Sequence, residues 1–236
     1  MKIPSLLLCL TVASQAAIVI SEFEPNPTGA DPDLVSFEIS GGNPNTAFSG
    51  FLSSIDTDPG SALGFLNSVE AVSGIFDSAG FLVLSIADLE NPSFVLVLSD
   101  TSPGAAGDSV DVDQDGSLDS IAPFGTVYDA IGVIDATDDA RSYASELGGS
   151  EFATANEWEI AFRDGATGNW YGVDTFSETV FDIAGNEVLG SGAGTFSSSP
   201  LVTSFGSANP EFSPVPEPSA VLLGGLALLG LLRRRR

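Results

Sequence analysis

Ile18-Val-Ile-Ser-Glu-Phe23 and Leu34-Val-Ser-Phe-Glu-Ile39 are two short segments rich in β-branched and aromatic residues. Each is bounded by Pro, Gly, Asn or Asp, the residues that end strands and form turns. Further segments of the same kind follow along the chain: Phe48–Ile55, Phe81–Ile86, Phe94–Leu98, Trp158–Arg163 and Thr179–Ile183. Many short strands at this spacing, with little helical periodicity, predict an all-β fold in the form of an antiparallel β-sandwich.

The composition around these strands divides the chain into four parts. Residues 17–190 contain the predicted strands, with one short helix expected within Asp139–Leu147, and are long enough for one domain with a full core. Residues 191–214 are rich in Ser, Gly and Pro, which predicts a linker. The two ends, residues 1–16 and 215–236, have the patterns of export signals.

The N-terminal end has the three regions of a secretory signal peptide. A positive start at Lys2 precedes the apolar core Ile3–Ala13, and small residues lead to Ala16. We therefore expect cleavage between Ala16 and Ala17. Cys9 is the one cysteine of the chain and lies inside this segment, so the mature chain has no disulfide although it enters an oxidising compartment.

The C-terminal end combines a short motif, an apolar run at 220–232 and a basic cap. The motif is Val215, Pro216, Glu217 and Pro218, and the cap is Arg233, Arg234, Arg235 and Arg236. Because proline disfavours helix at the preceding residue, the apolar helix begins only after the motif. Thirteen residues span about 20 Å against a hydrocarbon core of about 30 Å, which predicts a short transmembrane helix. The arginines resist translocation and mark the cytoplasmic end.

This three-part tail resembles the PEP-CTERM sorting signal of Gram-negative bacteria that make extracellular polysaccharide. The resemblance implies that the membrane peptidase exosortase is a partner and cuts near the Pro-Glu-Pro motif. It also implies a transient anchor in the inner membrane, followed by delivery to the cell surface or the outside. The alternatives are an ordinary short tail anchor and a buried apolar helix of a soluble fold.

The first two strand segments carry a second resemblance. With the Asn-Pro pair between them, they resemble the opening of bacterial lamin-tail domains, and Glu22, Asn26, Pro27 and Glu38 match that pattern. The resemblance implies an immunoglobulin-like sandwich that serves as a non-catalytic module. As turn formers, Asn26 and Pro27 would suit many other folds as well.

The charge of the mature chain is strongly negative. Without the two end segments, two basic residues, Arg141 and Arg163, face 31 acidic ones, a formal net charge of about −29. Such a surface repels phosphates, so we expect no nucleic-acid partner. It favours divalent cations, or simply keeps a secreted protein soluble. The two arginines are expected in ion pairs.

The chain contains no histidine. Its absence excludes Ser-His-Asp and Cys-His catalysis as well as imidazole zinc sites. A pair of carboxylates would still support glycoside hydrolysis, but no pair stands out among so many acids.

One acidic segment has the spacing of a calcium loop. Asp111, Asp113, Asp115, Ser117 and Asp119 occupy positions 1, 3, 5, 7 and 9. Glycine at position 6 permits a sharp turn, Leu118 would point inward, and position 7 offers its carbonyl. Alanine replaces the bidentate glutamate of an EF-hand at position 12. We expect Ca²⁺ here with a dissociation constant of roughly 10⁻⁴–10⁻³ M; the alternative is a solvated acidic turn.

Two weaker patterns have plain alternatives. Asp135, Asp138 and Asp139 form either a second cation site or a charged loop. Trp170-Tyr171 follows a probable turn and is a candidate carbohydrate-stacking face. Alternation predicts instead that Trp158 faces the core together with Ile160 and Phe162. 

Together these patterns predict an exported, non-enzymatic surface or extracellular-matrix protein that is stabilised by calcium and associates with extracellular polysaccharide. One alternative is a calcium-dependent carbohydrate-binding module, which requires Trp170 and Tyr171 to be exposed beside the ion. The other is a carboxylate-pair glycoside hydrolase, which requires two acids about 5–10 Å apart in a cleft.

Overall fold

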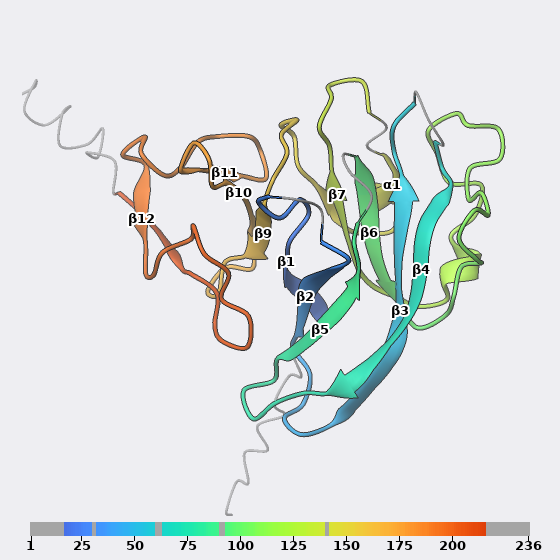
Figure 1. The fold of residues 1–236 in the computed structure, drawn as a ribbon, viewed down its shortest axis with the longest axis horizontal. Helices are drawn as coiled ribbons and strands as arrows, with labels where there is room; N and C mark the ends of the chain where they lie inside the picture. The colour runs from blue at the N-terminus through green and yellow to red at the C-terminus, as the bar shows by residue number, and fades with distance from the viewer. Residues whose placement is uncertain (1–16, 30–31, 60–62, 90–92, 140–141, 216–236) are drawn as a thin grey trace, which may run out of the picture.

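A computed structural model of the protein describes residues 17–29, 32–59, 63–89, 93–139 and 142–215. The first sheet has the strand order β11-β10-β9-β1-β2-β5 and the second β4-β3-β6-β7-β8 (Figure 1). The strands of the first sheet are β1 (Val19–Phe23), β2 (Leu34–Ser40), β5 (Leu82–Ala87), β9 (Ile160–Arg163), β10 (Trp170–Asp174) and β11 (Thr179–Asp182). Those of the second are β3 (Ala47–Asp56), β4 (Leu66–Ile75), β6 (Phe94–Ser99), β7 (Val127–Val133) and β8 (Ser150–Glu151).

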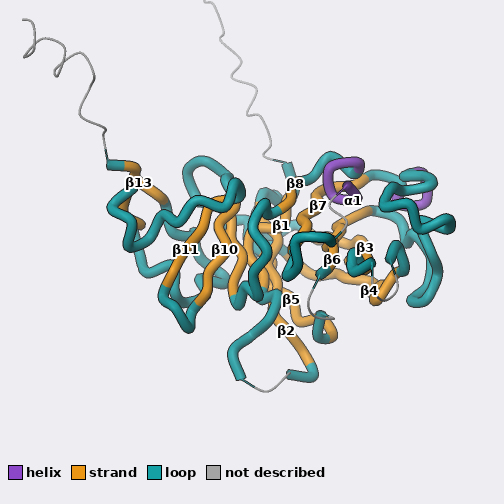
Figure 2. Tube along the Cα trace, turned by 90° about the horizontal axis from the view of Figure 1, so that it is seen from above, coloured by secondary structure: helices purple, strands orange, loops and turns teal. Residues whose placement is uncertain are grey.

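The two sheets pack against each other over one shared core. Phe23 and Phe37 from the first sheet meet Phe94 and Leu96 from the second in a single apolar cluster. Figure 2 shows the two sets of strands lying side by side when the molecule is seen from above. Apart from the parallel β7–β8 pair, the described strand pairs are antiparallel. The prediction of antiparallel sheets in an all-β sandwich is therefore confirmed.

The sequence of β6 is apolar without alternation because the strand is buried on both faces. All six of its residues are buried. Phe94, Leu96 and Leu98 face the shared core, whereas Val95 and Val97 face a second cluster on the other side of the sheet. A strand covered on both faces carries apolar side chains on both of them, as Phe94–Leu98 does; only the last residue, Ser99, is polar.

The outer face of the second sheet is covered by α1 (Ser142–Glu146) and by the long connection from β6 to β7, which contains the 3-10 turn η1 (Ala122–Phe124). Tyr143 and Phe124 are fully buried in this cluster. The predicted short helix within Asp139–Leu147 is therefore present, although it spans fewer residues. This arrangement places the acidic segment that begins at Asp111 directly beside α1.

The outer face of the first sheet is covered by residues 194–214, which we name the strap. The strap contains β12 (Gly194–Phe196) and β13 (Phe212–Pro214), which pair antiparallel. Its apolar residues Phe196, Leu201 and Phe212 pack on a third cluster formed by β9–β11. The expectation of a linker at 191–214 was therefore wrong, because a few large apolar residues within a Ser- and Gly-rich background are enough to dock the segment.

The aromatic residues of β10 are buried, contrary to expectation. Trp170 is 2 % exposed and Tyr171 4 %. Because both faces of the sheet are covered, neighbouring residues enter different clusters, Trp170 the shared core and Tyr171 the cluster under the strap. Trp158 precedes β9 and lies in the shared core, whereas Ile160 and Phe162 within β9 face the strap, so the expectation that the three share one face was wrong.

The predicted signal peptide (1–16) and the transmembrane helix (220–232) lie outside the described residues. Within the described part of the chain, no helix has the length and apolarity needed to cross a membrane.

Candidate metal centre in an acidic loop

The acidic loop, Asp111–Asp119, is held in place by backbone hydrogen bonds at both ends. Val110 N–H donates to the carbonyl of Gly64, and Asp119 N–H donates to the carbonyl of Val110. Gly116 has a φ of 86°, so the glycine at position 6 makes the predicted turn in a conformation that other residues avoid. The loop is therefore a closed turn whose base is attached to the second sheet.

Asp111 is the buried residue at the base of the loop. Its carboxylate accepts hydrogen bonds from the Asp115 N–H (3.1 Å), the Gly116 N–H (2.9 Å) and the Tyr143 hydroxyl (2.5 Å). Burial raises the pKa of Asp111, but these hydrogen bonds outweigh it, so the net pKa is lowered. Asp111 is therefore a fixed, ionised carboxylate. Its acceptance of the Tyr143 hydroxyl also ties the loop to α1.

Two exposed carboxylates converge on Asp111. One oxygen from each of Asp111, Asp113 and Asp115 lies within 4.8 Å of the others. The negative charge of Asp115 raises the pKa of Asp113, followed by smaller contributions from burial and from Asp111. Like charges this close repel each other, and a cation between them relieves that repulsion. No other described group of three acids meets the same distance condition.

Asp119 and Ser117, the other two predicted calcium ligands, make hydrogen bonds within the loop. The Asp119 carboxylate lies outside the group of three and accepts a hydrogen bond from Val112 N–H at 2.7 Å. Ser117 N–H donates to the Asp115 carboxylate at 2.9 Å. Asp119 therefore closes the loop instead of adding a fourth carboxylate to the cluster. Leu118 packs against the cluster under the second sheet, as the inward anchor that its position predicts.

Glu146 is a loop partner that the sequence did not indicate. Its carboxylate accepts the N–H of Leu118 at 2.9 Å, although the two residues are 28 positions apart. Burial and the hydrogen bond to Asp111 raise the pKa of Tyr143, and the negative charges of Asp111, Asp115 and Glu146 add smaller contributions. Local spacing carries no signal for such a residue, because only the docking of α1 brings it to the loop.

Outside the loop, a few charged side chains have specific partners. Arg163 forms an ion pair with the Asp129 carboxylate at 2.7 Å and lies 4.5 Å from the centre of the Trp170 ring. This confirms the expected ion pair for Arg163; Arg141 lies outside the described residues.

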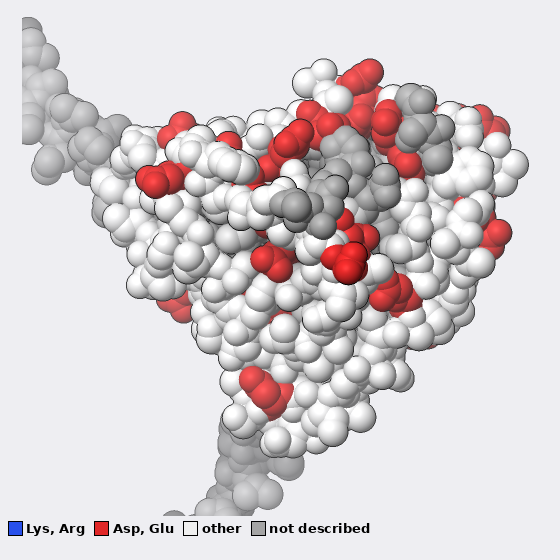
Figure 3. All heavy atoms as spheres, viewed as in Figure 1, with Lys and Arg blue, Asp and Glu red and all other residues white. Residues whose placement is uncertain are grey.

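At the predicted second cation site, the Ser93 hydroxyl donates to the carboxylates of both Asp135 and Asp139, while Asp138 is exposed. On the face seen in Figure 3, acidic side chains are spread widely and gather near the upper edge.

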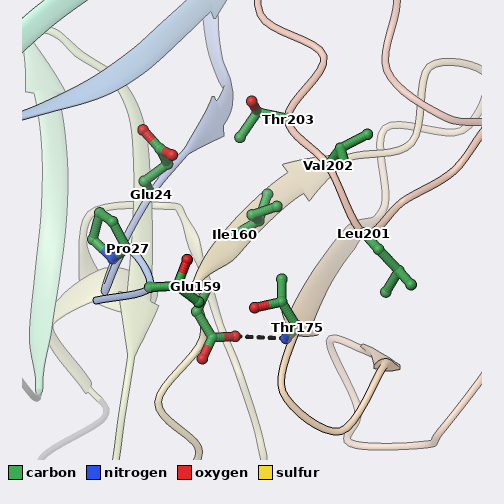
Figure 4. A pocket seen from close by; sticks show the side chains of 9 residues that line it. Glu24, Pro27, Glu159, Ile160, Thr175, Leu201, Val202 and Thr203 are labelled. Atoms are coloured by element: carbon green, nitrogen blue, oxygen red, sulfur yellow. Dashed lines mark hydrogen bonds between the residues drawn. The ribbon is translucent and has the colours of Figure 1, made fainter.

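A hollow of about 400 Å³ lies between the end of β1, the start of β9 and the strap. Glu24 and Glu159 line it, and burial raises the pKa of both. Figure 4 shows their carboxylates pointing away from each other, with Glu159 accepting the N–H of Thr175 at 2.7 Å. This orientation does not provide the two facing carboxylates that glycoside hydrolysis needs.

Comparison with known proteins identifies one region of the chain. Residues 214–236 match the PEP-CTERM protein-sorting motif. This motif indicates an exported protein that is processed by exosortase and anchored in the membrane only before processing. No curated protein and no solved structure matches the chain.

Proposed function

We propose that this chain is a non-enzymatic, calcium-stabilised β-sandwich that exosortase delivers to the cell surface or extracellular matrix, where it associates with extracellular polysaccharide. The observation that supports calcium binding most directly is that carboxylate oxygens of Asp111, Asp113 and Asp115 lie close together. The sorting motif supports the location, and the strongly acidic surface supports a role for cations.

The donors of the loop fit calcium better than a transition metal. Calcium prefers six to eight hard oxygen ligands, while zinc and copper favour nitrogen or sulfur. Asp111 is ionised and held by three hydrogen bonds, so one ligand is already oriented. The exposed Asp113 and Asp115 would complete the carboxylate set with little rearrangement of the backbone.

The exposure of the loop supports the proposed link to polysaccharide. Three carboxylates do not fill six to eight coordination positions, and Asp113 and Asp115 face solvent. Hydroxyl or carboxylate oxygens of a polysaccharide would occupy the remaining positions in place of water. Calcium would then bridge the acidic protein to the polymer and, where the polymer is anionic, offset the repulsion between them.

The alternatives receive less support. Burial of Trp170 and Tyr171 contradicts the carbohydrate-binding module that relies on these two rings. The diverging carboxylates of Glu24 and Glu159 do not favour a glycoside hydrolase. The likeness of Glu22 and Glu38 to the lamin-tail pattern, with the immunoglobulin-like topology it implies, stays a prediction.

Co-sedimentation with polysaccharide from an exosortase-containing bacterium tests this function. We expect the protein to sediment with the polymer in millimolar calcium and to remain in solution with chelator. Asp113→Asn should abolish the calcium effect, whereas Asp33→Asn, the same change at an exposed aspartate beside β2, should not. Equal sedimentation with and without calcium would contradict the bridging role.

A further inference from the structure

The outer face of the first sheet carries a continuous row of residues beneath the strap. In register across neighbouring strands, Val83 lies opposite Glu38, Glu38 opposite Glu22, Glu22 opposite Phe162, and Phe162 opposite Tyr171. Residues paired in this way share one face of a sheet. The row therefore has an aromatic half and a carboxylate half, and the strap contacts both.

The strap binds the aromatic half through two phenylalanines. Phe196 lies 6.0 Å from Phe162 and 5.3 Å from Tyr171, measured between ring centres. Phe212 lies 5.7 Å from Tyr171 and 5.1 Å from Phe196. The four rings form one cluster, so separation of β12 or β13 from the sheet would break several aromatic contacts at once.

The strap binds the carboxylate half through hydrogen bonds. The Glu22 carboxylate accepts the N–H of Ser204 at 2.9 Å and its hydroxyl at 2.8 Å. The Glu38 carboxylate accepts the N–H of Gly206 at 2.6 Å. Glu22 is 1 % exposed and Glu38 is fully buried, so these bonds lie in a water-excluded region where they are strong. Asn209 adds bonds to the carbonyls of Ser21 and Arg163.

The docked strap ends immediately before the sorting motif. Pro214 is the last residue of β13 and pairs with Gly194. Val215, the first residue of the motif, donates its N–H to the carbonyl of Ala193 at 2.8 Å. The next residue in the sequence is Pro216. The chain therefore has no free spacer between the folded domain and the motif.

We propose that the docked strap restricts access of exosortase to the sorting motif, so that processing proceeds from the state in which β13 has detached. This inference rests on the proposed processing by exosortase. Peptidases cleave locally opened chain, and when opening is fast the cleavage rate follows the population of the open state. Here the residues on the N-terminal side of the motif are hydrogen-bonded to β12 and to the residue before it, so detachment of β13 from β12 would set that population.

A disulfide lock tests the inference. Thr195 and Ser213 are paired opposite each other on β12 and β13, and both are exposed. Opposed residues of an antiparallel pair have Cα atoms roughly 4.5–5.5 Å apart, within the range that a disulfide spans. The mature chain contains no other cysteine. The full chain with Thr195→Cys and Ser213→Cys would be expressed in an exosortase-containing bacterium, and its processing followed by pulse-chase.

We expect the oxidised double variant to remain unprocessed and to recover the wild-type rate when reductant is added. Thr195→Cys alone is the matched control and should behave as wild type. Phe212→Ala should act in the opposite direction, with processing accelerated by about tenfold, because each loss of about 1.4 kcal/mol in docking raises the open fraction tenfold. Val97 lies on β6 in the second sheet and faces away from the strap, so Val97→Ala should leave the processing rate unchanged.

Processing of the locked variant at the wild-type rate would overturn the inference while leaving exosortase processing intact. A separate control distinguishes failure of this inference from failure of the proposed exosortase processing. If wild-type processing persists after deletion of exosortase, or after Glu217→Ala in the motif, the proposed processing itself fails and the inference falls with it.

Discussion

In the acidic loop, Asp113 and Asp115 are exposed and face a third carboxylate, whereas beneath the strap Glu22 and Glu38 are buried and bonded to the chain that covers them. Both regions concentrate negative charge in a molecule with little positive charge to offset it. In the loop, a cation from solvent would relieve the repulsion between exposed carboxylates. Under the strap, burial raises the pKa, so that a proton relieves the charge instead. On this account, carboxylates would respond to a cation where they are exposed and to a proton where they are buried.

The largest expected effect concerns Glu22. Burial raises its pKa to about 7, with smaller contributions from Glu38 and Glu24, while hydrogen bonds from Ser204 oppose the shift. A raised carboxyl pKa means that the folded state holds a proton that the unfolded state has lost. The stability from this group is fully present below pH 4.5 and is lost as pH rises through about 7. The loss is on the order of 3 kcal/mol.

Glu22→Gln should therefore be more stable than wild type at pH 8 and similar to it at pH 4.5, as measured by denaturant unfolding of both proteins across this range. Other buried acids also titrate: burial raises the pKa values of Glu38 and Asp129, whereas hydrogen bonds outweigh burial and lower that of Asp164. These groups are present in both proteins, so the difference in stability between the two proteins isolates the contribution of Glu22. Glu157→Gln, at an exposed position, is the control and should follow wild type. Parallel curves for wild type and Glu22→Gln would contradict the raised pKa of Glu22.

A smaller effect is expected when the link between the loop and α1 is removed. Tyr143→Phe keeps the buried ring but deletes the hydroxyl that donates to Asp111. Loss of a hydrogen bond to a charged group should lower stability by about 1.5–3 kcal/mol and weaken calcium binding as well. Calorimetric calcium titration and thermal unfolding measure the two effects. Tyr171→Phe, which also loses a hydroxyl but lies under the strap, should leave calcium affinity unchanged; an equal loss in both variants would contradict the link.

The smallest effect is expected at Asp119. Its carboxylate accepts a backbone N–H and lies outside the group of three. Asp119→Asn retains an acceptor oxygen, so the stability should change by about 0.5 kcal/mol or less. Calcium affinity should fall far less than in Asp113→Asn. A comparable fall in the two variants, measured by the same titration, would instead make Asp119 a ligand.

The sequence predicted the strands that are apolar or regularly patterned, including β3, β5 and β6. It missed β4, whose edge position leaves it half exposed with mixed residues, and β10, whose Trp170 follows a turn sequence. It also missed β7, whose apolar residues are interrupted by Asp129 and Gly132, and the two-residue β8. The strap was missed because its three large apolar residues are spread over seventeen positions. Docking of the strap also explains why Trp170 and Tyr171 are buried, since covering both faces of a sheet is a long-range effect that local alternation does not indicate.

The candidate site was predicted more fully than the fold, because its geometry is local. Alternate aspartates and a glycine at position 6 define the loop, and the structure brings Asp111, Asp113 and Asp115 together. Tyr143 and Glu146 could not be predicted, because they reach the loop only through packing of a helix distant in sequence.

Thermal unfolding of the full chain in 5 mM calcium and in chelator tests the central claim most directly. With a dissociation constant of roughly 10⁻⁴–10⁻³ M, calcium should stabilise the folded state by about 1–2 kcal/mol and raise the midpoint by a few degrees. Asp113→Asn should lose this shift, and Asp33→Asn should keep it. Equal midpoints for wild type in calcium and in chelator would contradict calcium binding at Asp111–Asp119.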